Sequence, residues 1–513
     1  MNSKPYAKRY GHGTHLKTKS YFSPSYIDHC SDTFGYMFPE VAQNPNNTLA
    51  CTEENRTLLI ELGDALGEKS DDPSTDSVIP AGYTYLGQFI DHDITLDPFS
   101  TLDCGQDPHK TQNFRTPALD LDAIYGRGPA VDPFLYDHDP NLGIGAGIKL
   151  LLGTNRPTGP GGPRGLNGIP GIPTNSDLPR TSDFTAIIGD PRNNENLLVS
   201  QLHHAMLKFH NAVVDHLIMK GQTGDDLFEK AREIVTHHYQ WVVIYDFLRR
   251  IVGDAVINLV KNGHQRFFKV DKIFMPVEFS VAAYRFGHSM IRTDYHINDG
   301  DFNPATLIEL FEFVRVPRLP VFSNWVVDFN RLFETGRELP INYAKKIDTH
   351  LSKQLESLPG ADPTDRIMRT LAIRNLLRGL AFGVPTGQSV AEYMGGVPLT
   401  ESMIKENATP KELEILNTCG GRLLKKTPLW YYVLKEAELT GGNSLGQVGA
   451  RIITEVFIAL LETDKRSFLN RKGGFTPHLP RINGKAAGDY DMVDILHFSG
   501  VLRPERVMAS MSL

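Results

Sequence analysis

The chain has 513 residues, of which 41% are hydrophobic and 22% are charged, a composition typical of a globular protein with a large core. Its formal net charge of -7 gives no reason to expect a nucleic acid or an acidic membrane as a partner. No uncharged apolar run reaches the roughly 18 residues that a membrane span needs, so we expect no membrane span.

The N-terminus and the cysteines bear on location. Residues 1–20 are basic but lack the apolar segment of a secretory signal peptide. The four cysteines are too few and too scattered for a disulfide scaffold or a zinc ribbon: Cys30, Cys51, Cys104 and Cys419. We therefore expect a cytoplasmic, reduced protein, with export by a route without a cleaved signal as the alternative.

Helical spacing of apolar residues dominates the second half of the chain. Residues 1–75 predict an extended N-terminal arm with one helix near 54–67, and 142–182 a long Gly/Pro-rich loop. Leu198, Leu202 and Val213 belong to a helix that begins near Asn194 and runs through Leu217. Further helices are expected over 226–261, 277–292, 304–314, 365–382, 399–406, 410–417 and 446–463. Strand patterns are few, so the predicted fold class is mainly α.

The segment YTYLGQFIDHDITLDP places polar groups within one helical turn. Gln88 and His92 are four apart and share a helix face, and Asp91 lies beside them. Asp93 is rotated away and can serve a different site. Burying such groups is costly without a purpose, so we interpret this face as a catalytic wall.

A second segment, TPALDLDAIYG, offers oxygen atoms at alternate positions. Its oxygen donors would be Thr116, the backbone of Ala118, Asp120 and Asp122. Hard cations prefer six to eight such oxygen ligands. Alone, an LDLD loop is more often a solvated turn, but a further ligand from Asp93 would make a calcium site.

Two later segments hold candidate pocket residues. In GDPRNNENLL, Arg192 and Glu195 are three apart, which fits either an ordinary ion pair at a helix start or a cation and a carboxylate in a pocket. In VAAYRFGHSMI, small residues before His288 would let a flat body approach the backbone. A lone histidine on an apolar face is usually a core residue, but Asn375 could accept the ring's other N–H.

Together and in this order, the four segments resemble the animal-type haem peroxidases, the group of myeloperoxidase and lactoperoxidase within the peroxidase–cyclooxygenase superfamily. The resemblance runs from about residue 78 to about residue 465 and implies one large helical domain over 76–513. It implies a haem b derivative and Ca²⁺ as cofactors. The distal side would hold Gln88, His92 and Arg192, and ester bonds to the haem would come from Asp91 and Glu195.

The resemblance also assigns the remaining positions. His288 would bind the haem iron, Asn375 would accept its hydrogen bond, and Arg285 and Arg378 would lie near the haem propionates. The calcium ligands would be Asp93, Thr116, Ala118, Asp120 and Asp122, with Asp122 where a serine is usual. Asn196 stands where myeloperoxidase has a haem-linked methionine, so that bond should be absent.

These assignments imply a peroxidase that uses hydrogen peroxide to oxidise halide, thiocyanate or small organic donors through a ferryl intermediate, with a role in the response to oxidative stress. One alternative is a fatty-acid dioxygenase, which has a tyrosine three residues before the proximal histidine; this chain has Arg285 there, with Tyr284 one step off. A metal-dependent phosphohydrolase and a non-catalytic haem-binding relative are further alternatives. The reducing substrate and the oligomeric state stay open.

Overall fold

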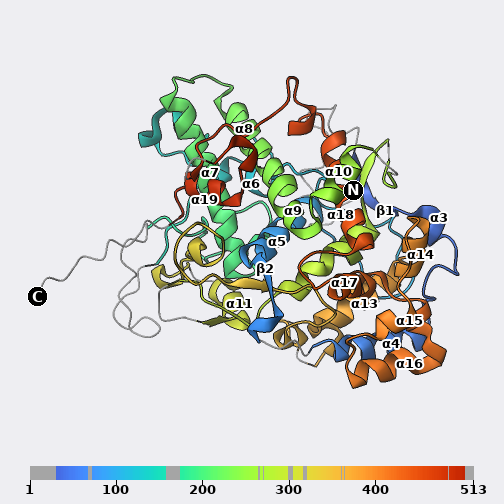
Figure 1. Ribbon diagram of the computed structural model, residues 1–513. Helices are drawn as coiled ribbons and strands as arrows, with labels where there is room; N and C mark the ends of the chain where they lie inside the picture. The colour runs from blue at the N-terminus through green and yellow to red at the C-terminus, as the bar shows by residue number, and fades with distance from the viewer. Residues whose placement is uncertain are drawn as a thin grey trace, which may run out of the picture.

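The computed structural model describes residues 30–67, 72–156, 174–263, 266–269, 271–298, 304–315, 320–359, 361–362, 364–482 and 485–502. Residues 157–173, in the middle of the predicted Gly/Pro-rich loop, lie outside these residues. Helices account for most of the regular structure and strands are short, which confirms the mainly α fold class. Figure 1 shows α5 near the middle of the molecule, beside α7 and α9.

The α-helices, in chain order, are α3 (Pro39–Ala42), α4 (Glu53–Ala65), α5 (Gly82–Ile94), α6 (Asp122–Tyr125), α7 (Leu197–Met219), α8 (Leu227–Val242), α9 (Arg249–Val252), α10 (Asp254–Lys261), α11 (Leu307–Arg315), α12 (Arg366–Arg369), α13 (Leu371–Ala381), α14 (Gly387–Tyr393), α15 (Glu401–Lys405), α16 (Pro410–Lys425), α17 (Leu429–Leu439), α18 (Gln447–Thr463) and α19 (Met492–Phe498). Two π-helical stretches, η6 (Val243–Leu248) and η7 (Glu278–Ala282), and two 3-10 stretches, η5 (Pro191–Asn194) and η8 (Ala283–Met290), matter for the site.

The strands form short pairs. β1 (Cys30–Gly35) runs parallel to β3 (Ile273–Pro276), and β2 (Asp76–Pro80) runs antiparallel to β6 (Tyr343–Lys345). β4 (Asp294–Tyr295) and β5 (Ala305–Thr306) form a third, antiparallel pair. Each pair joins segments that are distant in sequence or brackets a loop, so the strands fasten the helical body together.

The hydrophobic core is built around helices that are buried on nearly every side. α18 is buried from Val448 to Leu461, and most of α7 is buried as well. α7 packs against α5, α8 and α11, and α18 packs against α10, α17 and η8. A helix that is apolar all round belongs in the interior of a large protein.

The described part of the predicted N-terminal arm packs onto this core. α4 matches the helix expected near 54–67, and it lies against α13 and α16 in the lower right of Figure 1. Phe34, Phe38 and Leu62 are buried in the same hydrophobic cluster as the later helices. The segment from Cys30 onward is therefore part of the helical body.

Cys51 and Cys104 form a disulfide across 53 residues of sequence, with their Cα atoms 5.9 Å apart. The expectation of a reduced protein is wrong for this pair. Because 53 residues separate the two cysteines, their pairing could not be inferred from sequence spacing. The bond ties the residue before α4 to the loop that follows α5.

Several predicted helices are interrupted. The helix expected over 226–261 is divided into α8, η6, α9 and α10, with Gly253 at positive φ between the last two. The helix expected over 365–382 breaks at Thr370, and α16 has a kink at Thr418–Gly421, just after the predicted end at 417. The segment expected as an α-helix over 277–292 is instead a π-helical turn followed by a 3-10 stretch.

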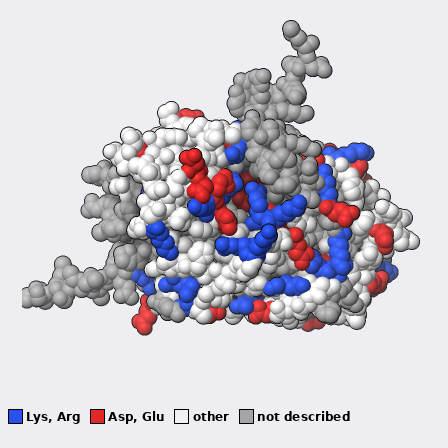
Figure 2. All heavy atoms as spheres, turned by 90° about the horizontal axis from the view of Figure 1, so that it is seen from above, with Lys and Arg blue, Asp and Glu red and all other residues white. Residues whose placement is uncertain are grey.

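On the face shown in Figure 2, basic and acidic side chains are interspersed. Among the residues that the structure describes, no helix combines the length and apolarity that crossing a bilayer requires.

Candidate active site

The predicted catalytic wall lies on α5, facing a cavity. The cavity has a volume of about 200 Å³ and is partly open to solvent. The cavity is lined by side chains from α5, from the start of α7, from η6, from η8 and from α11. It brings together Gln88, Asp91, His92, Glu195, Arg285 and His288.

His92 is held as a neutral base. Its Nδ1 lies 2.8 Å from Oδ1 of Asn193. A carbonyl oxygen can only accept, so Nδ1 bears the ring's proton and Nε2 keeps a lone pair. Burial, together with the nearby Arg192, lowers the pKa of His92 to about 3. Asn193, which the sequence analysis missed although it follows Arg192 directly, therefore fixes the tautomer of His92.

Glu195 is fixed on the cavity wall by a chain of amides. Gln88 donates from Nε2 to Oε1 of Glu195, and Asn196 donates to Oε1 of Gln88 over 3.1 Å. Asn196 is in turn the N-cap of α7, where its side chain accepts from the backbone N–H of Val199. Asn196 thus anchors both the helix and the amide chain.

Asp91 also lines the cavity. Thr95, one turn further along, donates its hydroxyl to Oδ1 of Asp91 over 3.0 Å. Burial raises the pKa of Asp91, although Arg192 and Arg285 act in the opposite direction. The carboxyl group lies on the same cavity wall as Glu195.

Arg192 does not lie on the cavity wall among the described residues. Its guanidinium binds Asp190, with Nη2 2.7 Å from Oδ2, and donates to the carbonyl oxygens of His92 and Thr95 over 3.1 and 2.6 Å. The carbonyls at the end of a helix attract a cation, which explains this position. The expected distal arginine is thus behind the end of α5, close to His92.

Another part of the cavity wall comes from η8. In a 3-10 stretch, residues three apart point the same way, so Arg285 and His288 share a face. Burial, with Arg285 and Arg374 nearby, lowers the pKa of His288 to about 3, so its ring is neutral. Gly287 also lines the cavity, and a Cβ there would meet nothing within 4 Å. Glycine therefore leaves the wall open next to His288.

Asn375 contacts His288, but not as the expected acceptor, because its amide nitrogen, which is a donor, is nearest the ring. Its Nδ2 lies 2.9 Å from Nδ1 of His288, and its Oδ1 accepts from Nη1 of Arg285 over 2.8 Å. Because Arg285 takes the amide oxygen, Arg285 helps to fix Asn375 against the histidine. Arg378 lies outside the cavity lining, where its guanidinium is 3.4 Å from Asp97 and bonds Ser100.

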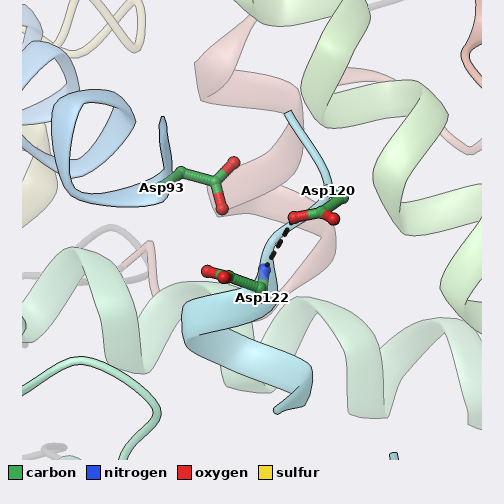
Figure 3. A group of neighbouring side chains, drawn as sticks. All are labelled: Asp93, Asp120 and Asp122. Carbon is green, nitrogen blue, oxygen red and sulfur yellow. Dashed lines mark hydrogen bonds between the residues drawn. The ribbon is translucent and has the colours of Figure 1, made fainter. Parts of the chain in front are cut away.

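A carboxylate cluster adjoins the end of α5. Oxygens of Asp93, Asp120 and Asp122 lie within 4.8 Å of one another, and Figure 3 shows Asp93 and Asp120 turned toward each other. Burial and the two neighbouring carboxylates raise the pKa of Asp93 well above its ordinary value. Oδ1 of Asp93 is buried with no hydrogen-bond partner among the described residues. Thr116 and Ala118 are buried in the loop that leads to Asp120.

A buried arginine links this cluster to Arg192. Arg115, fully buried, pairs through Nη1 with Asp122 over 2.8 Å and through Nη2 with Asp190 over 2.7 Å. Asp190 then binds Arg192, so charges alternate from the cluster to the end of α5. Arg115 also offsets the extra carboxylate that Asp122 brings. Sequence analysis missed Arg115 and Asp190, although Arg115 directly precedes TPALDLDAIYG and Asp190 lies within GDPRNNENLL.

Comparisons with known proteins agree with this architecture. Residues 99–480 match the family described as animal haem peroxidase. The matched range begins after the end of α5, so the motif around His92 stands just outside it.

Curated relatives are distant and longer. The chain is 25% identical over 376 residues to the peroxidasin homolog pxn-2 of Caenorhabditis elegans, covering 70% of this chain and 27% of that protein. It is 23% identical over 373 residues to thyroid peroxidase of Rattus norvegicus, covering 70% of this chain and 39% of that protein. For dual oxidase of Drosophila melanogaster the identity is 23% over 314 residues, covering 57% of this chain and 19% of the relative. The chain thus spans less than half the length of these relatives.

Solved structures share the fold. Peroxidase A of Dictyostelium discoideum superposes with a TM-score of 0.59 at 16% identity, covering 86% of this chain and 89% of that one. The fatty acid alpha-dioxygenase of Oryza sativa gives a TM-score of 0.56 at 15% identity, covering 82% and 75%. Because the family match extends over most of the sequence, the chain belongs to the animal haem peroxidase family.

Proposed function

We propose that the chain is a haem peroxidase that reduces hydrogen peroxide and oxidises a small donor such as a halide, thiocyanate or a phenol. The observation that supports this most directly is that two neutral histidines, His92 and His288, line one cavity. A neutral imidazole is what both an iron ligand and a proton acceptor require. A role in the response to oxidative stress would follow from the same activity.

The cavity fits a haem b group. His288 would bind the iron through Nε2, which has no hydrogen-bond partner among the described residues. That role needs a lone pair on Nε2 and the ring proton on Nδ1, so the Asn375 amide would have to turn its oxygen toward Nδ1, where its nitrogen now lies at 2.9 Å. Gly287 leaves room on the wall for a flat ring. Asp91, Glu195 and Arg285 line the cavity. Asp91 and Glu195 would form the ester bonds, and Arg285 would meet a propionate. When bound, the haem would supply the iron that binds peroxide and the electrons that break its O–O bond.

His92 would move the proton that this reaction requires. Its Nε2 would accept a proton from hydrogen peroxide and return it to the oxygen that leaves as water. Asn193 keeps Nδ1 protonated throughout, so the lone pair stays on the side of the cavity. Arg192 would act on the developing negative charge from the end of α5, where Asp190 holds it.

We propose a calcium ion at the carboxylate cluster. Asp93, Asp120 and Asp122 supply anionic oxygens, and the unpartnered Oδ1 of Asp93 fits a cation better than it fits an apolar interior. Thr116 and Ala118 would complete the ligand set. Because Asp93 follows His92 directly, an ion there would fix the end of α5 and with it the catalytic histidine.

The calcium proposal is tested by thermal unfolding of the purified protein with Ca²⁺ and with a chelator. A hundredfold excess over Kd adds about 2.7 kcal/mol to the free energy of unfolding. The increase should vanish in Asp93→Asn and persist in Asp225→Asn, a control at an exposed position. Equal stabilisation in both variants would place the ion elsewhere.

A fatty-acid dioxygenase is the second candidate, because Tyr284 lines the cavity and a dioxygenase shares the fold. The hydroxyl of Tyr284 donates to the backbone carbonyl of Gly87 over 3.2 Å. The position three residues before His288, where a dioxygenase has its tyrosine, is occupied by Arg285. Oxygen uptake with a long-chain fatty acid, compared with peroxide-dependent oxidation of iodide, thiocyanate and guaiacol, separates the two activities.

The test of peroxidase activity uses protein reconstituted with haem. A Soret band and donor oxidation with peroxide are expected. His92→Leu should slow the reaction with peroxide by about 10²–10⁴, the range for losing a general acid–base group, whereas His109→Leu at the surface should not. Fatty-acid oxygenation without donor oxidation would overturn the peroxidase proposal.

We also propose that the protein works in an oxidising compartment. The Cys51–Cys104 disulfide supports this, because such bonds are rare where the cytosol keeps thiols reduced. Alkylation of the protein from its native source, before and after reduction, counts the free thiols. Alkylation of Cys51 and Cys104 without reduction would contradict the proposal.

A further inference from the structure

The cavity wall holds three tyrosines whose hydroxyl groups have different partners. They are Tyr83 at the start of α5, Tyr85 on the same helix and Tyr284 in η8. Tyr284 donates to the carbonyl oxygen of Gly87, and Tyr85 lies against Tyr295. Neither partner is a base that can keep a proton, since a backbone carbonyl and a phenol are both very weakly basic.

Tyr83 differs because its partner is a carboxylate. Its hydroxyl lies 2.9 and 2.8 Å from the two oxygens of Asp246, and only 1% of the Tyr83 side chain is exposed. Burial and Asp246 raise the pKa of Tyr83 well above its ordinary value, so the phenol keeps its proton at rest. The pair is therefore a buried phenol with a proton acceptor already in place.

The surroundings of Asp246 hold it in position. It accepts from Nε of Arg250 over 2.8 Å and from the backbone N–H of Met492 over 2.9 Å. It belongs to the π-helical stretch η6, a kind of irregularity found frequently at functional sites. Phe247, the next residue, lines the cavity itself. The π-helical turn thus presents one residue to the cavity and the other to Tyr83.

A phenol that loses an electron becomes a strong acid, so the electron leaves readily only if the proton can leave with it. Of the three cavity tyrosines, only Tyr83 satisfies this condition. We propose that Tyr83 is a redox-active residue that returns one electron to the haem centre after peroxide reduction and passes its phenolic proton to Asp246. This inference rests on the proposed peroxidase function.

The electrons and protons of this step balance. Hydrogen peroxide, the oxidant, takes two electrons as its O–O bond breaks; the outer oxygen leaves as water with both peroxide protons, and the inner oxygen is left at the oxide level. The haem centre has then lost two electrons, and it recovers one of them from Tyr83. Tyr83 becomes a neutral phenoxyl radical, and its O–H proton binds the Asp246 carboxylate. Arg250 keeps its bond to Asp246 and lies with its Cζ 4.4 Å from the centroid of the Tyr83 ring.

Such a residue would let a two-electron oxidant serve one-electron donors. One oxidising equivalent would be stored in the cavity wall, and the other would remain at the haem. Burial protects the stored radical from solvent, because Tyr83 and Asp246 are both nearly inaccessible.

The test is electron paramagnetic resonance of the haem-reconstituted protein, frozen after mixing with peroxide in the absence of a donor. A tyrosyl signal is expected, and it should narrow when the protein is made with ring-deuterated tyrosine. The signal should be lost in Tyr83→Phe and in Asp246→Asn, which retains the shape but cannot hold the proton. Tyr85→Phe and Tyr284→Phe are matched controls that should retain it.

The samples are compared at the same extent of reaction between haem and peroxide, which is measured from the change of the Soret band. A nitroso spin trap with peptide mapping locates the radical independently. A tyrosyl signal that persists in Tyr83→Phe, or an adduct on another tyrosine, would overturn the assignment to Tyr83. A Soret change without any tyrosyl signal would overturn it too, yet leave the peroxidase proposal standing. Absence of a Soret change in the wild-type protein would instead refute the peroxidase function, and this inference with it.

Discussion

Replacing Arg115 by alanine would remove the central cation of the buried charge chain. Arg115 has no exposed side-chain surface, and its partners Asp122 and Asp190 are at most 2% exposed. Its guanidinium also donates to the carbonyl oxygen of Gly189 over 2.9 Å. The substitution therefore leaves two buried carboxylates without one of their counter-ions.

Removing one partner of a buried ion pair costs about 3–5 kcal/mol, because an uncompensated charge remains in the interior. A chain of 513 residues has an unfolding entropy of about 1.1 kcal/mol per kelvin at its midpoint if it unfolds as one unit. The Tm of Arg115→Ala should therefore fall by about 3–5 °C. Arg115→Lys keeps the charge but lacks the forked guanidinium, so its Tm should lie between the Tm of Arg115→Ala and that of the wild type.

Differential scanning calorimetry at pH 7 measures the full difference in Tm between Arg115→Ala and the wild type. Burial alone would raise the pKa of Asp190, but Arg192 and Arg115 hold it well below its ordinary value. The resulting stability is present above the unfolded-state pKa of about 3.9 and is lost as the pH falls through the folded-state pKa.

Arg249→Ala is the matched control, since Arg249 pairs with Asp254 at the surface. Its loss should lower the free energy of unfolding by less than about 1 kcal/mol. A Tm loss in Arg115→Ala no larger than in this control would refute the reasoning.

The remaining predictions concern the cofactor and the disulfide. His288→Ala should prevent stable haem uptake; a Soret band with histidine-type ligation that survives gel filtration would contradict the proximal role. After exposure to peroxide, denaturing extraction should leave haem on the wild-type protein and release it from Asp91→Val with Glu195→Gln, and equal retention would exclude both esters. Replacing Cys51 and Cys104 by serine should lower the free energy of unfolding by about 4 kcal/mol, because the disulfide closes a loop of 53 residues. The variant should therefore have a lower Tm than the oxidised wild type.

The sequence predicted best where one helix sets the geometry. The spacing of Gln88 and His92 placed them on one wall because α5 is a regular helix, and α7 and α18 follow from apolar repeats. α17 was missed because its LWYYV start is rich in aromatic residues, which favour strands, and because a helix buried all round has no polar face to reveal its period.

The features that the sequence did not predict depend on contacts between segments that are distant in sequence. The spacing of Arg192 and Glu195 showed that they are near each other, but it could not show that Asp190 and the carbonyls ending α5 hold Arg192. The change from π-helical to 3-10 geometry before His288 likewise has no local signature, because the sequence looks apolar and helical throughout. Tyr83 gave no signal either, since Asp246 lies 163 residues further along the chain.

The division of the cavity wall among distant segments bears on how the protein matures. Residues from 83 to 92, Glu195, Phe247 and the stretch from 284 to 291 meet at one cavity, and α17 and α18 support η8 from behind. During synthesis, therefore, a receptive cavity cannot exist until the ribosome has released nearly all of the chain through α18. Prosthetic-group loading would then come after folding, and a truncated product lacking the last helices would remain colourless.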